Sequence, residues 1–223
     1  MGHINQNTFK FLKDLQDNNT REWFAEEKER YEAALADVRL FVADLINSLS
    51  QFDPHITTDI QANKCLFRIY RDTRFSKDKT PYKNWFGAGI SKDGRKLDGP
   101  EYYIHISPDN SFIACGYWRP EKKHLDAIRQ EIDYNEEKFN AIIADLQKKS
   151  GLTLEEEDKL KRPPAGYEAT HPSIEFLKLK SFVAHKSLSD SALTDKNALN
   201  NIIALYKTML PLKQYLHEAI DND

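Results

Sequence analysis

The sequence predicts an α+β fold, with N-terminal and C-terminal helices packed around one mainly antiparallel sheet. In the first and last thirds of the chain, apolar residues recur at the spacing of an amphipathic helix. In the middle third, short β-rich segments are separated by turns and do not alternate with helices, as the strands of a doubly wound parallel sheet do. We therefore expect a single domain over residues 1–223.

Two helices are predicted at the N-terminus. An i, i+3 stripe of apolar residues begins at Phe9, and after a polar break the helical spacing resumes at Trp23 and continues to Leu49. Thr20 is suited to be the N-cap of the second helix, because its hydroxyl can accept a hydrogen bond from a free backbone N–H. Pro54 ends the helical region, since proline disfavours helical backbone in the residue before it.

Four strands are predicted in the middle of the chain. The last two are joined by Pro108-Asp109-Asn110, and aspartate and asparagine tolerate the backbone geometry of a tight turn. Such a connection favours antiparallel pairing of the neighbouring strands. The expected strands are residues 65–71, 85–90, 102–106 and 112–117.

The C-terminal half predicts mainly helix. Pro120 is suited to the first turn of a helix whose apolar spacing continues to Ile132, and a further helix over 136–149 ends at Gly151. Residues 151–172 are charged and then contain prolines, which is typical of a long surface connection. The remaining expected elements are a short helix at 174–179, a strand at 181–186 and a final helix from 189 to about 219 that Pro211 kinks or interrupts.

Composition excludes several classes of protein. The chain is 40% hydrophobic and 30% charged, which provides enough apolar residues for a core. No apolar run approaches the ~18 residues of a membrane span, and the N-terminus lacks the apolar core of a signal peptide, so we expect no membrane partner and a cytoplasmic location. Cys65 and Cys115 provide no disulfide framework. The net charge of −3 excludes a uniformly basic nucleic-acid coat protein.

One segment concentrates positive charge. Between Lys64 and Lys83 the chain has seven basic and two acidic residues, a balance of +5 in a chain of net charge −3, so the remainder carries −8. Segregation of this kind attracts anions, and arginine and lysine side chains bind phosphate and carboxylate groups. We therefore expect a binding site for a phosphorylated or otherwise anionic small molecule on this strand and loop. Its candidate residues are Arg68, Arg71, Arg74, Lys77, Lys79 and Tyr82.

His105 is a further candidate ligand-binding residue. Tyr103 and His105 share one face of the third predicted strand, and Arg68 and Tyr70 share one face of the first. If the two faces coincide, these side chains line one surface, where an imidazole with an unperturbed pKa near ~6.5 can act as a general acid or base. The alternative is a half-exposed sheet face with a hydrogen-bonded imidazole.

Two other functions remain open for the basic segment. It can be an internal ion-pair network, with surface pairs such as Arg71–Asp72 and Lys77–Asp78, in a structural or protein-interaction domain. It can also be a module that binds single-stranded nucleic acid. In that case the bases stack on the aromatic residues that lie between the basic ones, which are Tyr70, Phe75 and Tyr82. The −8 carried by the rest of the chain argues against this nucleic-acid alternative.

No cofactor, metal site or reaction can be read from the sequence. The seven histidines are scattered and include no His-x-His or His-Glu-x-x-His pair. There is no Gly-x-Ser-x-Gly elbow, and both cysteines lie in apolar strand patterns, where a thiol is usually inert. Because no acid–base pair is assignable, the sequence leaves open whether the protein is an enzyme.

Three segments form recognisable blocks. They are RIYRDTRFSKDKTPYKNWFGAGI at 68–90, GPEYYIHISPDNSFIACGYWRPEKKHLDAIRQEI at 99–132 and HPSIEFLKLKSFVAHKSLSD at 171–190. They closely resemble the blocks of the domain of unknown function 2461 family, over about residues 9–216. The resemblance implies a single α+β domain but no established activity, and one departure lies at Cys115-Gly116-Tyr117, where the family is richer in glycine. It implies a signature, without a role for its members, at Arg71, Asp72, Arg74, Phe75, Ser76, Lys77, Asp78, Lys79, Pro81 and Tyr82.

Overall fold

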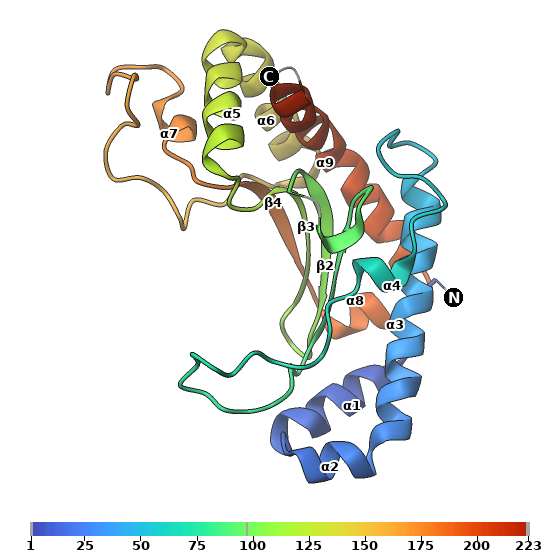
Figure 1. The fold of residues 1–223 in the computed structure, drawn as a ribbon. Helices are drawn as coiled ribbons and strands as arrows, with labels where there is room; N and C mark the ends of the chain where they lie inside the picture. The colour runs from blue at the N-terminus through green and yellow to red at the C-terminus, as the bar shows by residue number, and fades with distance from the viewer. Residues whose placement is uncertain (1, 97, 222–223) are drawn as a thin grey trace. The chain divides into compact units, whose positions relative to one another are not determined.

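The computed structural model describes residues 2–96 and 98–221. Over these residues the α+β class is confirmed, with nine α-helices and one four-stranded antiparallel sheet in the order β1-β2-β3-β4 (Figure 1). No helix in this part of the chain is long and apolar enough to cross a membrane. That residues 1–223 form a single domain stays a prediction.

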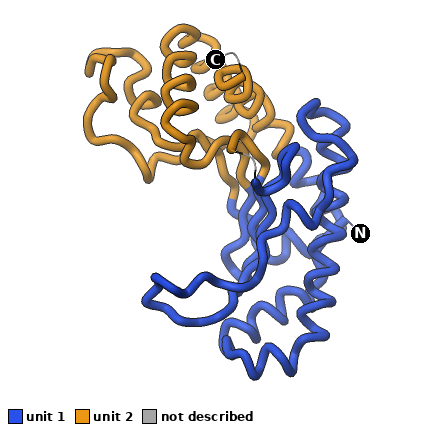
Figure 2. Tube along the Cα trace, viewed as in Figure 1, with its two compact units in different colours: residues 1–96, 103–113, 187–204 blue, residues 97–102, 114–186, 205–223 orange. Residues whose placement is uncertain are grey.

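The chain divides into two compact units (Figure 2). Unit 1 is residues 1–96, 103–113 and 187–204, and unit 2 is residues 97–102, 114–186 and 205–223.

The helices at the start of unit 1 follow the predicted apolar spacing. Thr20 is the N-cap of the second of them, and its hydroxyl accepts a hydrogen bond from the backbone N–H of Trp23 at 3.2 Å. The long helix expected after Thr20 is divided at Glu27, which is both the C-cap of one helix and the N-cap of the next. The three helices are α1 (Gln6–Asp17), α2 (Arg21–Glu26) and α3 (Lys28–Leu49).

Three of the four strands predicted in the middle of the chain are present, and the strand predicted near 181–186 is also present. The turn between the second and third strands contains Asp109 in the left-handed region, with φ of 58°, as turn aspartates tolerate. A short 3-10 helix, η1 (Gly94–Lys96), follows the first strand. The strands are β1 (Phe86–Ile90), β2 (Glu101–Ile106), β3 (Ser111–Tyr117) and β4 (Phe182–Leu188).

The strand predicted over 65–71 is wrong. Ala62–Cys65 form helix α4, and beyond it Leu66 forms a single bridge with Ala88, whereas Tyr70 forms one with Tyr82. Both bridges join the segment to the same stretch of chain, residues 82–88, but the register shifts by two residues between them, so no continuous hydrogen-bonded ladder develops.

Unit 2 holds the first three predicted helices of the C-terminal half. The buried ring of Phe139 packs between two others, with its centroid 5.1 Å from that of Phe176 and 5.1 Å from that of Tyr215. Gly151 ends the second helix in the left-handed conformation, with φ of 69°. The described residues 151–172 contain no helix and only isolated bridges. The helices are α5 (Lys122–Tyr134), α6 (Glu136–Ser150) and α7 (Ile174–Leu177).

The predicted final helix is divided into α8 (Asp190–Thr194) and α9 (Ala198–Asp221). The break follows from Asp195, whose carboxylate accepts a hydrogen bond from the backbone N–H of Asn197 at 2.7 Å, a local bond that competes with helical geometry. Pro211 is expected to kink or interrupt the helix. It does not interrupt it, because it lies inside α9, and the kink stays a prediction.

Strand β2 separates two faces of the sheet. Tyr102, Ile104 and Ile106 have no exposed surface, whereas Tyr103 and His105 are half-buried. This alternation is the period-two pattern expected when one face of a strand packs on the core. It therefore places Tyr103 and His105 together on the other face, as the sequence predicts.

The neighbouring strand allows only glycine at position 116 of β3. Its φ is 136°, a conformation that residues with a Cβ rarely adopt. A Cβ here would overlap the carbonyl oxygen of Phe182 and lie 2.9 Å from the Cα of Val183. Both are backbone atoms of β4, so this steric overlap can be removed only if β3 and β4 move apart.

We expect Gly116→Ala to destabilise the fold by about 1–3 kcal/mol more than Gly151→Ala, because overpacking against fixed atoms costs that much. Gly151 is a matched control: it also has a positive φ, but a Cβ there would meet nothing within 4 Å. Urea unfolding of the two variants measures the difference. Equal losses would show that β4 does not constrain this position.

Candidate functional site

The basic segment forms a loop that is closed at its base (Figure 1). Tyr70 and Tyr82 pair as an antiparallel bridge, flanked by two backbone hydrogen bonds of 2.9 and 2.8 Å. The side-chain amide of Asn19, just before α2, accepts from the backbone N–H of Tyr82 at 3.1 Å and donates to its carbonyl at 2.9 Å. Residues 71–81 therefore leave from and return to a fixed point in unit 1.

Inside the loop, two arginines are paired with two aspartates. The Arg71 guanidinium contacts the Asp78 carboxylate and the Thr80 hydroxyl. Arg74 makes a two-pronged contact with Asp72, at 2.6 and 3.0 Å. Hydrogen bonds from the Thr80 backbone N–H and from Arg71 lower the pKa of Asp78 to about 2. The charges of Arg71 and Arg74 are therefore already compensated within the loop.

The expected pairs Arg71–Asp72 and Lys77–Asp78 are not formed, and these predictions are wrong. Neighbouring side chains on extended backbone point in opposite directions, whereas residues two apart share a side, as Asp72 and Arg74 do. Lys79 donates to a backbone carbonyl of the loop, that of Thr73, at 2.8 Å.

Tyr82 and Phe75 lie in opposite environments. Tyr82 is 7% exposed, and its ring stacks on Phe24 with 3.9 Å between centroids and 13° between planes. Phe75 is 94% exposed, with the Arg74 guanidinium 5.8 Å from its ring. Lys77 is exposed on the same loop. The structure thus places Tyr82 in the core of unit 1 and not on a surface open to a ligand.

A different set of side chains comes together on the half-buried side of unit 1. The His105 ring stacks on Phe112, with 4.9 Å between centroids and 15° between planes, and lies 4.6 Å from the Trp85 ring. The Tyr103 ring lies 5.7 Å from Phe112 and 6.1 Å from Phe67. All five residues are half-buried. We call this set the aromatic face: Phe67, Trp85, Tyr103, His105 and Phe112.

Gly87 allows Tyr103 to reach across β1. A Cβ at Gly87 would lie 2.7 Å from the Tyr103 hydroxyl oxygen and 2.9 Å from the Trp85 ring. The Tyr103 hydroxyl also lies 3.2 Å from Nδ1 of His105. The small residue therefore gives the phenol room to order the histidine ring.

His105 is neutral at physiological pH. Burial lowers its pKa from 6.5 to about 4, because a desolvated imidazole resists taking up charge. The sequence expectation of an imidazole poised near pH 6.5 for general acid–base work is therefore corrected. His105 offers hydrogen-bonding nitrogens and a flat ring instead.

Two cations lie beside the aromatic face, and a third, Arg68, lies near one of them and near Asp72. The Lys83 ammonium is 4.6 Å from the Trp85 ring centroid and 5.6 Å from that of Phe67, and the Arg95 guanidinium is 6.0 Å from Phe67. Burial, and then the nearby Arg68 and Arg95, lower the pKa of Lys83. We call Arg68, Lys83 and Arg95 the cation group. Within the described residues, no member forms an ion pair with a carboxylate.

Members of the cation group are instead tied to backbone. Lys83 donates to the carbonyl of Arg68 at 3.0 Å, and Arg95 donates to that of Lys64 at 3.0 Å. These bonds use one donor on each side chain and leave the positive charges uncompensated. The remaining N–H donors are the groups that an anion would engage.

The sequence analysis found part of this arrangement. Arg68 and His105 were candidates, but the shared surface is formed without Tyr70, whose ring lies 6.3 Å from Phe24. Lys83 and Arg95 were missed as site residues. Lys83 and Trp85 are two residues apart, and this spacing indicates that their side chains share one side of an extended segment. No local sequence signal places Arg95 of η1 over Phe67.

A surface hollow of about 710 Å³ adjoins the cation group. Arg95 belongs to both, and the hollow is lined by the segment leading into α4 and by η1. Four basic side chains and two acidic ones line it, so it is also electropositive. These charged residues are Lys64, Lys92, Arg95, Lys96, Asp59 and Asp93.

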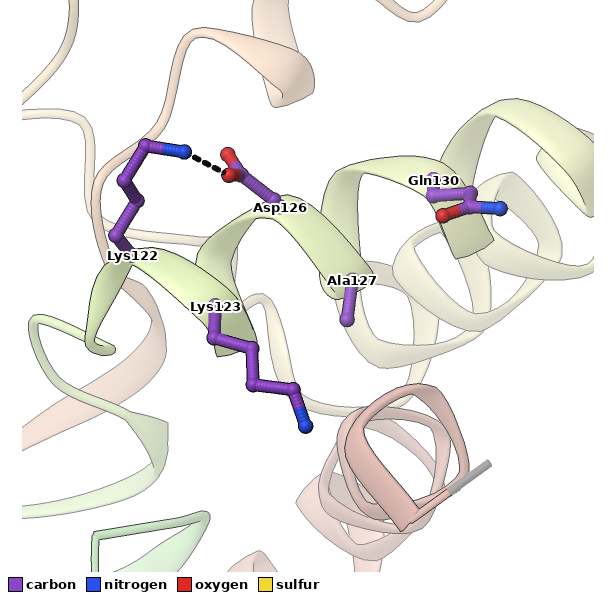
Figure 3. A pocket seen from close by; sticks show the side chains of 5 residues that line it. All are labelled: Lys122, Lys123, Asp126, Ala127 and Gln130. Atoms are coloured by element: carbon purple, nitrogen blue, oxygen red, sulfur yellow. Dashed lines mark hydrogen bonds and ion pairs between the residues drawn. The ribbon is translucent and has the colours of Figure 1, made fainter. Parts of the chain in front are cut away.

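A second hollow, of about 500 Å³, lies along α5 in unit 2 (Figure 3). Lys122 pairs with Asp126 at 2.5 Å, one helical turn away, and Lys123 points away from that pair. This is the ordinary charge pattern of an exposed helix face. It brings together no arrangement suited to recognising a ligand.

Comparison with known proteins finds the same family that the three sequence blocks resemble. Residues 7–215 match the family described as Conserved hypothetical protein (DUF2461). No curated protein and no solved structure matches the chain. The family match spans almost all of the chain and includes the loop, the aromatic face and the cation group. The chain therefore belongs to the DUF2461 family of conserved hypothetical proteins.

Proposed function

We propose that unit 1 binds a small planar anion, of the class of nucleotides and other phosphorylated aromatic molecules, through the aromatic face and the cation group. The observation that carries this proposal is the meeting of two cations, Lys83 and Arg95, with half-buried aromatic rings, without an ion pair to a carboxylate among the described residues. Lys83 joins the two sets, since its ammonium lies over both Trp85 and Phe67.

Electrostatics support an anion at this position. Arg68, Lys83 and Arg95 lie close enough for the arginines to lower the pKa of the lysine. Like charges held together repel one another, and half-buried charges repel more strongly than exposed ones because less water screens them. A phosphate or carboxylate among them removes that repulsion and accepts charge-assisted hydrogen bonds from the free N–H donors.

The aromatic face supports a flat ligand. Aromatic side chains stack on nucleobases and similar rings, typically with about 1–3 kcal/mol for each stacked base. The neutral state of His105 matters here, because a neutral imidazole can stack on a ring and accept a hydrogen bond. The hollow beside Arg95 provides further room, of a volume usual for small-molecule sites.

We assign the loop 71–81 a different role, an ion-pair network of a structural or partner-binding kind. Arg71 and Arg74 each contact an aspartate of the same loop, and Phe75 is almost fully exposed at its end. A cytoplasmic location belongs to the same proposal, because the buried cysteines Cys65 and Cys115 suit a reducing compartment.

Removing a cation should weaken binding selectively. Lys83→Gln is expected to reduce the affinity for adenosine monophosphate about tenfold or more, the equivalent of losing one charge-assisted hydrogen bond. Isothermal titration with adenosine monophosphate, adenosine and inorganic phosphate measures this, and the first should bind tightest because it has both ring and anion. At a concentration of 100 Kd a ligand adds about 2.7 kcal/mol of stability, so melting temperature gives a second readout.

Arg74→Ala is the matched control for that experiment. It removes a basic side chain from the same segment, but one that is paired with Asp72, so the affinity should stay at the wild-type value. If Arg74→Ala weakens binding as much as Lys83→Gln, the loop and not the cation group is the anion site. Absence of binding by all three probes would refute the proposed function.

Removing a stacking ring should weaken the binding of the ring-bearing ligand alone. Trp85→Leu is expected to lower the affinity for adenosine monophosphate by about five- to a hundredfold, as loss of a stacking contact does. Trp118→Leu serves as control, since Trp118 is a tryptophan of unit 2, 55% exposed and outside the aromatic face. Circular dichroism confirms that both variants fold. Equal affinities would show that the ligand does not contact Trp85.

The His105 imidazole is expected to titrate near pH 4 in the folded protein, which nuclear magnetic resonance of the ring measures, with His105→Gln identifying the signal. Because the folded pKa lies below the unfolded value of 6.5, the unfolded chain takes up this proton first. The residue therefore contributes stability above about pH 6.5 that is lost as the pH falls towards 4. A midpoint at or above pH 6 would contradict the neutral assignment.

A further inference from the structure

Tyr117, the last residue of β3, connects two polar side chains and one backbone N–H of unit 2. It is 2% exposed. Its hydroxyl donates a hydrogen bond to Oδ1 of Asp98 at 2.6 Å and lies 2.6 Å from Nδ1 of His124. The backbone N–H of Glu121 faces the same oxygen. One buried phenol thus touches a residue from the segment before β2 and two residues from the start of α5.

These contacts determine which nitrogen of His124 carries the proton. A carboxylate can only accept hydrogen bonds, so the phenolic proton of Tyr117 is directed to Asp98. The phenolic oxygen then accepts from Nδ1–H of His124, which leaves a lone pair on Nε2. Histidines that bind metals have this arrangement, in which one ring nitrogen donates to an oxygen and the other binds the ion.

The free nitrogen faces a carboxylate at a suitable distance. Nε2 of His124 lies 3.7 Å from Oε1 of Glu121, and one ligand atom from each of Asp98, Glu121 and His124 lies within 4.8 Å of the others. Ligands about 2.1 Å from a tetrahedral ion lie roughly 3.4 Å apart. Glu121 is the N-cap residue of α5 but makes no capping bond with its side chain, so its carboxylate is available.

We propose that Asp98, Glu121 and His124 bind a divalent transition-metal ion of the Zn²⁺ class. One imidazole and two carboxylates, with a remaining position for water, form a donor set that Zn²⁺ takes in proteins. The positive end of the α5 dipole opposes a cation here, and the two carboxylates supply the −2 that offsets it. Asp98 and Glu121 are exposed, so their side chains can turn to close the coordination.

Isothermal titration of Zn²⁺ into the full chain, first stripped of metal with EDTA, is expected to give one site per chain. His124→Ala and Glu121→Gln should each weaken that site at least tenfold. Tyr117→Phe keeps the ring but removes the hydroxyl that orients Asp98 and His124, and it should weaken binding by about 10–100-fold. Mg²⁺ should not compete, because it disfavours an imidazole ligand.

His185→Ala is the matched control. Nδ1 of His185 lies 2.7 Å from Glu155, an imidazole–carboxylate pair of the same unit that belongs to no three-residue group among the described residues. Binding should be unchanged in this variant, and the absorption spectrum of bound Co²⁺ should be altered only by the changes at Glu121, His124 and Tyr117. Absence of saturable Zn²⁺ binding, or equal affinity in wild type, His124→Ala and Glu121→Gln, would overturn the assignment. If Tyr117→Phe fails to fold, these two variants decide it.

Discussion

Complete burial of one face of β2 is the constraint on which the candidate site depends. Tyr102, Ile104 and Ile106 lose all contact with water, and burying side chains of this kind stabilises a fold by about 1.5–3 kcal/mol each. A shift of register by one residue would exchange the two faces and lose that stabilisation. Tyr103 and His105 are therefore fixed on the opposite face. Burial there is only partial, which leaves ring surface open and still holds the imidazole neutral.

The basic side chains divide into two groups according to what lies beside them. Arg74 meets Asp72 two residues away in the same loop, and exposed pairs of this kind contribute little free energy. Such pairs set the loop's conformation and compensate the charges of its two arginines. Lys83 and Arg95 come from separate segments and lie over rings, and within the described residues neither forms an ion pair with a carboxylate. Burial lowers the pKa of Lys83, and in the function we propose an anionic ligand offsets this desolvation.

Local signals predicted the helices and most strands because the residues that decide them are adjacent in the sequence, as Thr20 is to the helix it caps. The strand predicted at 65–71 failed because the register of its pairing with residues 82–88 shifts between Leu66 and Tyr70, and propensity does not encode register. Charge counting found the basic segment, but a count cannot separate Arg71, which meets Asp78, from Arg68, which meets Lys83. That distinction is conformational. Arg95 lies outside the segment altogether, so only the fold brings it over Phe67.

In the function we propose, the aromatic face and the cation group act on a ligand through one shared side chain, Lys83, and this determines which ligands the site selects. The Lys83 ammonium lies over Trp85 and Phe67 and close to two arginines. Inorganic phosphate satisfies the cations but leaves the rings uncovered, and an uncharged aromatic molecule covers the rings but leaves the cations repelling one another. A molecule that has both an anionic group and an aromatic ring engages Lys83 in both interactions, so the entropy cost of ordering that side chain arises only once. Contacts that share a residue are not independent, so we expect the proposed site to bind such a molecule more tightly than either inorganic phosphate or an uncharged ring.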